Sequence, residues 1–258
     1  MELRDAVIVV TGGGGGIGRA LCRRFKQEGA AAVVVADVDR DAAEAAATEL
    51  GGMAVVTDVR AEVAVRELVE RTLAAYGRVD VYCSNAGVAF GGGPKAPDDA
   101  WQQSWEVHVM AHVYAARAVL PGMLERGAGY FVGTISAAAL LNHVLASPYA
   151  TTKAAALSFF EWLAIAYGDR GIGVSAICPM GVRTAMLARE GERGFLWEGA
   201  IEPEAVAAAL IDAMRDGRFL VLPHPEVAEY VRRKADDYDR WLSGMRRLRK
   251  RVLGVTKS

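Results

Sequence analysis

The sequence has few cysteines, almost no net charge and no long uninterrupted apolar run, and each shortage argues against a class of protein. The three cysteines, Cys22, Cys83 and Cys178, are odd in number and far apart. They match neither a disulfide framework nor a metal-ligand spacing, so we expect buried thiols in a reducing compartment. The formal net charge of −1 provides no long-range attraction to nucleic acid or to an anionic membrane.

Membrane and secretion signals are lacking as well. The most apolar stretch, residues 130–146, contains Thr134, Ser136, Asn142 and His143, so it does not predict a membrane span. The first residues mix acidic and basic side chains and lead directly into a strand-like segment, which argues against a signal peptide. We therefore expect a cytoplasmic protein without nucleic-acid or membrane partners. The basic run at residues 246–251 is interpreted as a solvated face or an oligomer contact.

The chain has the length and composition of one large soluble domain, residues 1–258, with 52% hydrophobic and 24% charged residues. Short apolar, β-branched runs alternate with longer amphipathic segments, among them 61–76, 101–125 and 149–169. This alternation predicts an α/β fold: a single doubly wound Rossmann-like domain, whose parallel sheet of about seven strands has helices on both faces. The predicted strands are 6–11, 32–36, 53–57, 79–83, 130–135, 173–178 and 218–222.

Two regions depart from this alternation. Residues 184–216 open with a stretch in which possible glycine hinges alternate with apolar side chains, which is typical of a substrate lid but also fits a plain surface loop. Residues 225–251 are predicted to form a C-terminal helical segment. The glycines of the expected lid are Gly191, Gly194 and Gly199, and its apolar residues are Met186, Leu187, Phe195 and Trp197.

A run of five glycines, residues 12–16, follows the first predicted strand, and a helical pattern begins at Arg19. Glycine permits a tight turn with positive φ and lets the backbone approach a pyrophosphate closely. The N-terminus of the following helix offers unpaired N–H groups to the same phosphates. Because the run lies between a first strand and a first helix, it predicts a dinucleotide-binding turn and not a linker.

Asp37 directly follows the second predicted strand, 19 residues after Gly18. At that position a carboxylate accepts hydrogen bonds from the adenosine ribose and repels a 2′-phosphate. No Arg or Lys lies within the glycine run. We therefore expect NAD(H) as the cofactor in preference to NADP(H); the alternative is that Asp37 only caps a helix.

Tyr149 and Lys153 have i,i+4 spacing on a predicted helix, so both side chains project from one face. A lysine ammonium ~4 Å from the phenol, at an effective dielectric constant of ~20, favours phenolate by about 4 kcal/mol, or roughly 3 pKa units. Such a shift brings the tyrosine into the range where it can act as an acid–base catalyst near neutral pH. The spacing is common by chance, so it needs further support.

That support comes from Ser136, which ends a strand-like run 13 residues before Tyr149 and can bind the reacting oxygen. With Thr11-Gly12, Gly16-Ile17-Gly18, Ser84-Asn85-Ala86-Gly87 and Pro179…Val182-Arg183-Thr184 in this order, the pattern resembles the short-chain dehydrogenase/reductase superfamily over nearly the whole chain.

The resemblance implies roles at the matching positions. Ser136, Tyr149 and Lys153 would be catalytic: Tyr149 exchanges a proton with the substrate oxygen while hydride moves between the substrate carbon and the nicotinamide. Lys153 would also bind the nicotinamide ribose and connect the phenol to a water chain. The implied cofactor-binding residues are Gly12, Gly16, Ile17, Gly18, Asp37, Asp58, Val59, Asn85, Ala86, Gly87, Tyr149, Lys153, Val182 and Thr184.

His108 is the main departure from the family pattern, because it stands where the family usually has an asparagine that supports the water chain. Imidazole donates, accepts and titrates near neutrality, so His108 is a catalytic candidate that either serves the proton relay or slows it. His108 and His112 also have i,i+4 spacing, but no third ligand is evident and no metal site is predicted. Milder departures are Ser84 in place of a common asparagine and Met180 in place of a glycine.

The sequence thus predicts an NAD(H)-dependent oxidoreductase that interconverts a secondary alcohol and a ketone on an apolar substrate. The alternative is a dinucleotide-binding regulatory or scaffold protein whose turnover is impaired by His108. From the family we expect a homotetramer, or else a dimer, with a small-molecule substrate.

Overall fold

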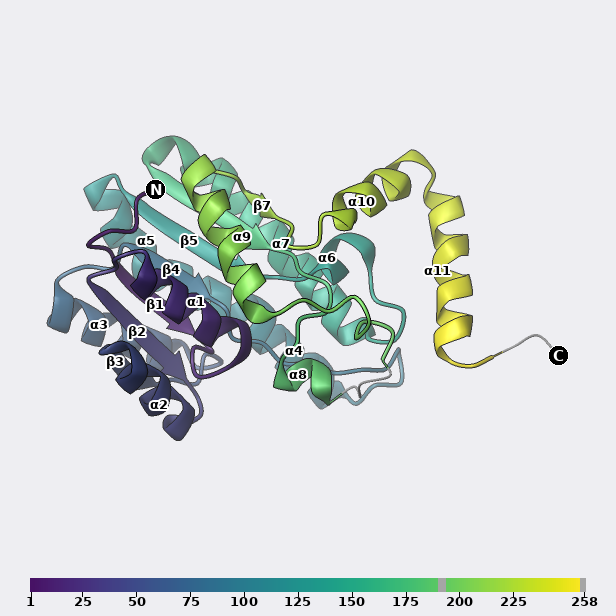
Figure 1. Ribbon diagram of the computed structural model, residues 1–258, viewed down its shortest axis with the longest axis horizontal. Helices are drawn as coiled ribbons and strands as arrows, with labels where there is room; N and C mark the ends of the chain where they lie inside the picture. The colour runs from purple at the N-terminus through teal and green to yellow at the C-terminus, as the bar shows by residue number, and fades with distance from the viewer. Residues whose placement is uncertain (190–193, 256–258) are drawn as a thin grey trace.

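A computed structural model describes residues 1–189 and 194–255 (Figure 1), and within them seven strands form one sheet in which all strands run parallel. The strand order is β3-β2-β1-β4-β5-β6-β7. The predicted doubly wound α/β fold is therefore confirmed. The strands are β1 (Val7–Thr11), β2 (Ala32–Asp37), β3 (Met53–Val56), β4 (Val81–Ser84), β5 (Gly129–Thr134), β6 (Ile172–Ile177) and β7 (Leu220–Val221).

The strands are apolar on both faces because helices cover both sides of the sheet. In β1, Ile8 and Val10 enter one core and Val9 enters the other. The first core is closed by α1 (Gly16–Gln27), α2 (Arg40–Leu50) and α9 (Pro203–Asp216), and the second by α3 (Glu62–Tyr76), α5 (Ala111–Arg126) and α7 (Ser147–Tyr167).

The strand order reverses at β1, which has β2 on one side and β4 on the other. In such sheets the loops at the carboxyl ends of the strands diverge on either side of this point, and ligands bind in the crevice between them. The glycine run follows β1, Asp37 ends β2, and Asn85 follows β4. The fold therefore brings the predicted cofactor residues to one edge of the sheet.

The predicted helix 101–125 is not continuous in the structure. It consists of α4 (Asp98–Trp105), a π-helical turn η1 (Glu106–Met110) and α5. A π-helical turn inserts one residue into the helix and changes the direction in which its side chains project, and such turns are frequent at functional sites. His108 lies in the middle of this turn.

The C-terminal segment also differs from the single helix expected over 225–251, because it forms α10 (Glu226–Asp236) and α11 (Tyr238–Val252). The break is at Asp237, which has extended backbone geometry and accepts a hydrogen bond from Arg240 N at 2.9 Å. An internal N-cap thus starts a second helix, which ends an arm at the edge of the molecule (Figure 1). Across the described residues, no helix has both the length and the apolar character that crossing a bilayer requires.

Candidate active site

The glycine turn requires glycine at the positions where its backbone folds back on itself. Gly12 and Gly16 have φ values of +63° and +50°, which favour glycine. A Cβ on Gly18 would lie 2.0 Å from the carbonyl oxygen of Gly12. Gly15 is the N-cap of α1, and the described residues supply no side-chain cap and no acidic residue in the first turn. The first N–H groups of α1 are therefore placed to bind an anion such as a pyrophosphate.

Asp37 lies beside this turn, half-buried at the end of β2. Its Oδ2 accepts a hydrogen bond from Gly14 N at 3.0 Å, and its Oδ1 accepts one from Asp39 N at 3.1 Å. Backbone donors thus orient the carboxylate toward the dinucleotide end of the crevice, where it can accept bonds from sugar hydroxyls.

Asp58 and Val59 follow β3 but differ in their surroundings. Asp58 forms an ion pair with Arg60 at 2.7 Å, and hydrogen bonds from this arginine lower the pKa of the carboxyl. Val59 is buried in the second core. The carboxylate therefore already has a cationic partner, whereas Val59 provides an apolar contact surface.

A chain of hydrogen bonds runs from the glycine turn to Lys153. Asn85 Nδ2 donates to Gly12 O at 3.3 Å and to Thr11 O at 2.9 Å, and Thr134 Oγ1 donates to Asn85 Oδ1 at 2.8 Å. Lys153 Nζ donates to Thr134 O at 2.8 Å. The sequence alone does not single out Thr134, because its only signal is its position as the last residue of β5, two residues before Ser136.

Lys153 is 3% exposed, and this burial lowers its pKa to about 7, against a small opposing effect of Cys178. Its Nζ lies 5.7 Å from the centre of the Tyr149 ring. Tyr149 is half-buried in the first turn of α7, so its phenol and Lys153 share one face of this helix. An ammonium beside a phenol favours the phenolate, so the pair is suited to exchange a proton with a bound molecule.

Ser136 is 7% exposed and is the N-cap of α6 (Ala137–Leu141). Its Oγ accepts a hydrogen bond from Ala138 N at 3.1 Å, which leaves the hydroxyl proton available for a substrate oxygen. The structure thus places Ser136 two residues beyond the carbonyl that binds Lys153.

His108 is completely buried, and its ring nitrogens bind two different segments. Nε2 accepts from Val88 N at 3.2 Å, so in the neutral ring Nδ1 carries the proton and donates it to Thr152 Oγ1 at 2.8 Å. Burial, followed by the charge of Lys153, holds the pKa of His108 well below its usual value. The ring edge contacts the Tyr149 ring, with centres 5.4 Å apart. The uncharged His108 ring therefore links the loop after β4 to α7 through two hydrogen bonds.

His112 makes a separate contact, because its Nδ1 bonds to Ser84 Oγ at 2.6 Å and its ring packs against Phe160. Burial lowers the pKa of His112 to about 3. The two histidines therefore do not converge on a common ligand. Within the described part of the chain, no group of three or more His, Cys, Asp or Glu side chains is arranged to hold a metal ion.

The segment after β6 closes the opposite side of the glycine turn. A Cβ on Gly16 would lie 3.0 Å from Thr184 Cγ2, and Val182 is buried and forms a bridge with Ile201. Of the expected lid, 184–216, residues 203–216 instead form α9 and pack into the first core, because one face of this helix is apolar. The part before α9 includes α8 (Ala185–Ala188) and residues 194–200, and Gly191 lies outside the described residues. The Phe195 ring packs against His143, with centres 5.4 Å apart.

The chain is similar to known proteins in both sequence and fold. Residues 6–193 match the short chain dehydrogenase family. The chain is 35% identical over 256 residues to a 1-deoxy-11-beta-hydroxypentalenate dehydrogenase of Streptomyces exfoliatus, covering 94% of this chain and 92% of that protein. It is 33% identical to a meso-2,3-butanediol dehydrogenase of Serratia marcescens, covering 81% and 87%. A short chain dehydrogenase/reductase from Burkholderia phymatum, solved in complex with NAD, superposes with a TM-score of 0.85 at 28% identity, covering 93% and 96%.

Proposed function

The chain belongs to the short chain dehydrogenase family, and from this premise we propose that it is an NAD(H)-dependent oxidoreductase that interconverts a secondary alcohol and its ketone. The observation that carries the proposal is the hydrogen-bonded chain that joins the glycine turn to Lys153 through Asn85 and Thr134. It connects the end suited to a dinucleotide with the side chains suited to proton transfer. The names of the two relatives, a hydroxypentalenate and a butanediol dehydrogenase, support an alcohol as the substrate.

In the proposed mechanism the Ser136 hydroxyl donates a hydrogen bond to the substrate oxygen, and Tyr149 exchanges the one transferred proton with that oxygen. Lys153 stabilises the phenolate form of Tyr149 through its positive charge. A bound nicotinamide supplies or accepts the hydride. Through its bonds to Thr152 and Val88, His108 fixes the position of α7 relative to the loop after β4, and so it positions the Tyr149 ring.

NAD(H) is the proposed cofactor because the Asp37 carboxylate is fixed beside the glycine turn by Gly14 N. A 2′-phosphate at this place would meet a negative charge, whereas the free ribose hydroxyls of NAD would find an acceptor. The solved relative with NAD bound is consistent with this choice.

The assembly and the surroundings of the substrate complete the proposal. Trp162, Ile165 and Trp105 are 55%, 83% and 44% exposed on α7 and α4, an apolar surface that a homotetramer would cover. Phe195, which precedes α9, packs against His143, and this contact supports a lid that is formed by the residues between β6 and α9. The three buried, unpaired cysteines fit a reducing compartment such as the cytoplasm.

Replacing Tyr149 by Phe tests the proton-transfer role. Parent and Tyr149→Phe proteins are mixed with NAD and a panel of secondary alcohols, and NADH absorbance is followed. We expect kcat to fall by about 10²- to 10⁴-fold, the usual contribution of a general acid–base group, while NAD affinity stays nearly unchanged. Equal rates on any active alcohol would refute the role of Tyr149, and NAD binding without turnover of any alcohol by the parent would favour the regulatory alternative.

The cofactor choice is tested by calorimetry with NAD and NADP. We expect the parent to bind NAD at least about tenfold more tightly, and Asp37→Ser to narrow that ratio chiefly by tightening NADP. The matched control is Asp39→Ser, because Asp39 caps α2 through Ala42 N and does not contact the glycine turn. Equal affinities of the parent for both cofactors would contradict the proposal.

A further inference from the structure

Helix α11 is amphipathic but leaves its apolar face largely uncovered. Trp241, Met245, Leu248 and Val252 follow one another at spacings of four, three and four residues, so they lie along one side of the helix. None of the side chains of α11 is buried. A helix of this composition needs an apolar partner along that stripe, and the protein body fills the place only in part.

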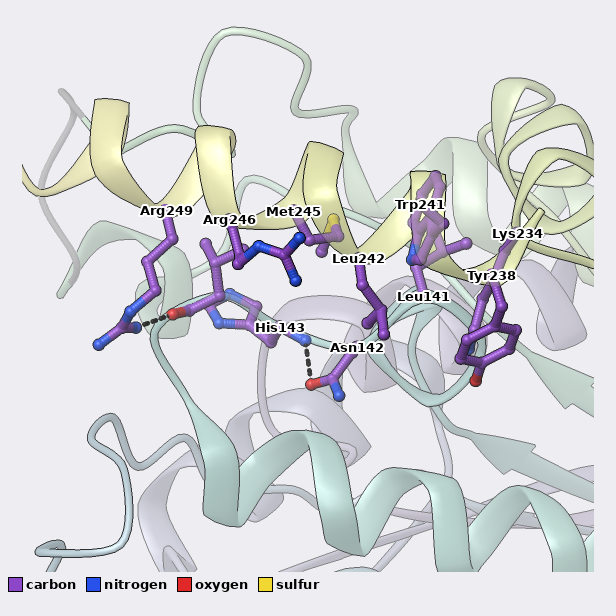
Figure 2. Close-up of a pocket in the computed structure, with 11 residues that line it drawn as sticks. Leu141, Asn142, His143, Lys234, Tyr238, Trp241, Leu242, Met245, Arg246 and Arg249 are labelled. Carbon is purple, nitrogen blue, oxygen red and sulfur yellow. Dashed lines mark hydrogen bonds between the residues drawn. The ribbon is translucent and has the colours of Figure 1, made fainter.

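A cavity of about 310 Å³, hereafter the α11 groove, lies between the body and the first half of this helix, where Trp241 and Met245 of the stripe line it. Figure 2 shows α11 on one side and the segment after α6 on the other, with the side chains of both pointing into the gap. The apolar lining comes from Leu141 on the body and from Trp241, Leu242 and Met245 on α11. Its volume is that of a small-molecule site.

The polar groups around the groove have one sign of charge. Lys234, Arg246 and Arg249 line it, and among its described lining residues none is acidic. Ion pairs elsewhere in the described chain involve arginines on most helices, but none of them includes these three residues. Lys234 Nζ donates to Leu140 O at 2.5 Å, and Arg249 donates to Val144 O. The Arg246 side chain extends over His143 (Figure 2).

His143 adds a neutral donor to this rim. Its Nδ1 accepts from Leu145 N at 3.2 Å, so the proton of the neutral ring is on Nε2. Burial keeps the pKa of His143 below its usual value, which leaves the ring uncharged near neutrality. The groove therefore combines an apolar wall, three cations without an ion-pair partner among the described residues, and a neutral N–H donor.

We propose that the α11 groove binds an amphipathic anion, an apolar molecule that carries a carboxylate. The apolar body packs on Trp241, Leu242 and Met245, and the carboxylate accepts hydrogen bonds from Arg246, whose planar guanidinium matches its two oxygens. None of the proposed catalytic residues lines the groove. Its floor, the segment between α6 and α7, nevertheless links Ser136 to Tyr149, so a bound anion contacts the loop that joins the two. The site is independent of the proposed oxidoreductase function.

Decanoate is the probe that tests this site, measured by calorimetry with the full-length protein well below its micelle concentration. We expect saturable binding that Arg246→Glu weakens at least about tenfold, because the substitution replaces a partner of the carboxylate by a like charge. The matched control is Arg247→Glu, which makes the same charge change on the same helix at a residue that bonds Ser243 and does not line the groove. It should alter affinity by less than about threefold.

Binding of decanol and binding of phosphatidylglycerol vesicles distinguish the proposed amphipathic anion from other occupants of the groove. Decanol should lose little affinity in Arg246→Glu, because it lacks the charge. Failure of decanoate to bind, equal weakening by Arg246→Glu and Arg247→Glu, or binding of phosphatidylglycerol vesicles without binding of free decanoate would each overturn the proposal. The proposed homotetramer covers the apolar surface of α4 and α7; if it also covered the groove, decanoate would fail to bind and the proposal would be wrong. None of these readouts depends on alcohol turnover, so a failure of the proposed function would leave them intact.

Discussion

The glycine turn and the proposed catalytic cluster, defined as Ser136, Tyr149, Lys153 and His108, lie at the same edge of the sheet but are built in opposite ways. The turn requires the absence of side chains, because its backbone atoms approach one another closely, as at Gly18 and the Gly12 carbonyl. The cluster works through buried side chains whose partners come from distant segments, as when Lys153 bonds Thr134 and His108 bonds Val88. Local sequence therefore specifies the first region, and the fold specifies the second.

The largest expected effect is on the cluster. Lys153→Met should lower kcat by about 10²- to 10⁴-fold, because the phenol of Tyr149 loses the cation that stabilises its ionised form. NAD affinity should fall far less, since the glycine turn and Asp37 are untouched. Steady-state kinetics and NAD calorimetry on the same preparation measure both. A variant that kept its turnover would show that the cluster does not depend on its buried cation.

The same substitution has a stability signature. Lys153 has a pKa of about 7 in the folded protein and 10.5 as its reference value, so between these pH values the unfolded chain binds more protons. The contribution of Lys153 to the free energy of unfolding is therefore lowest below pH 7. It rises by about 1.4 kcal/mol per pH unit as the pH increases from 7 to 10.5. Urea unfolding at several pH values should show this rise in the parent and its loss in Lys153→Met. Lys95→Met, at an exposed position, should keep the parent profile.

The glycine turn offers a matched pair of substitutions with a smaller effect. Gly18→Ala would place a methyl group 2.0 Å from Gly12 O, whereas a Cβ on Gly15 has nothing within 4 Å. We expect Gly18→Ala to weaken NAD binding at least about tenfold or to destabilise the protein, and Gly15→Ala to change affinity by less than about threefold. NAD calorimetry and thermal unfolding distinguish the two. If both variants behaved alike, close backbone approach would not be what the turn requires.

The smallest expected effect concerns His108. An asparagine keeps some hydrogen-bonding capacity but is smaller than the imidazole, so His108→Asn should lower kcat/KM by less than about tenfold. The pH profile should keep its shape, because His108 stays neutral in the folded protein. Thr152→Val, which removes the partner of Nδ1, should have a similar effect. A shifted profile would instead assign His108 to proton transfer, and a large gain in turnover would show that it slows the relay.

The fold and the cofactor edge were largely predictable, because a parallel sheet needs apolar strands and the turn needs glycine at fixed places. Segment ends were less so: η1 interrupts the expected helix 101–125, and Asp237 divides the expected C-terminal helix. At η1, His108 bonds across to Val88, and at the C-terminal break Asp237 caps its own turn. The first is a tertiary contact with no local signal, and the second is an N-cap signal that the amphipathic pattern obscured.

By itself the sequence determined the order of strands and helices along the chain, because periodicity encodes it, and its ordered motifs pointed to the family. Ser136, Tyr149 and Lys153 became a candidate catalytic set through that resemblance. The tertiary structure alone decided that Thr134 joins Lys153 to Asn85, that the neutral His108 ring links the loop after β4 to α7, and that α11 faces a cationic groove. The physical reason is burial: the protonation and partners of a side chain depend on which distant groups exclude water around it, and spacing along the chain does not contain that information.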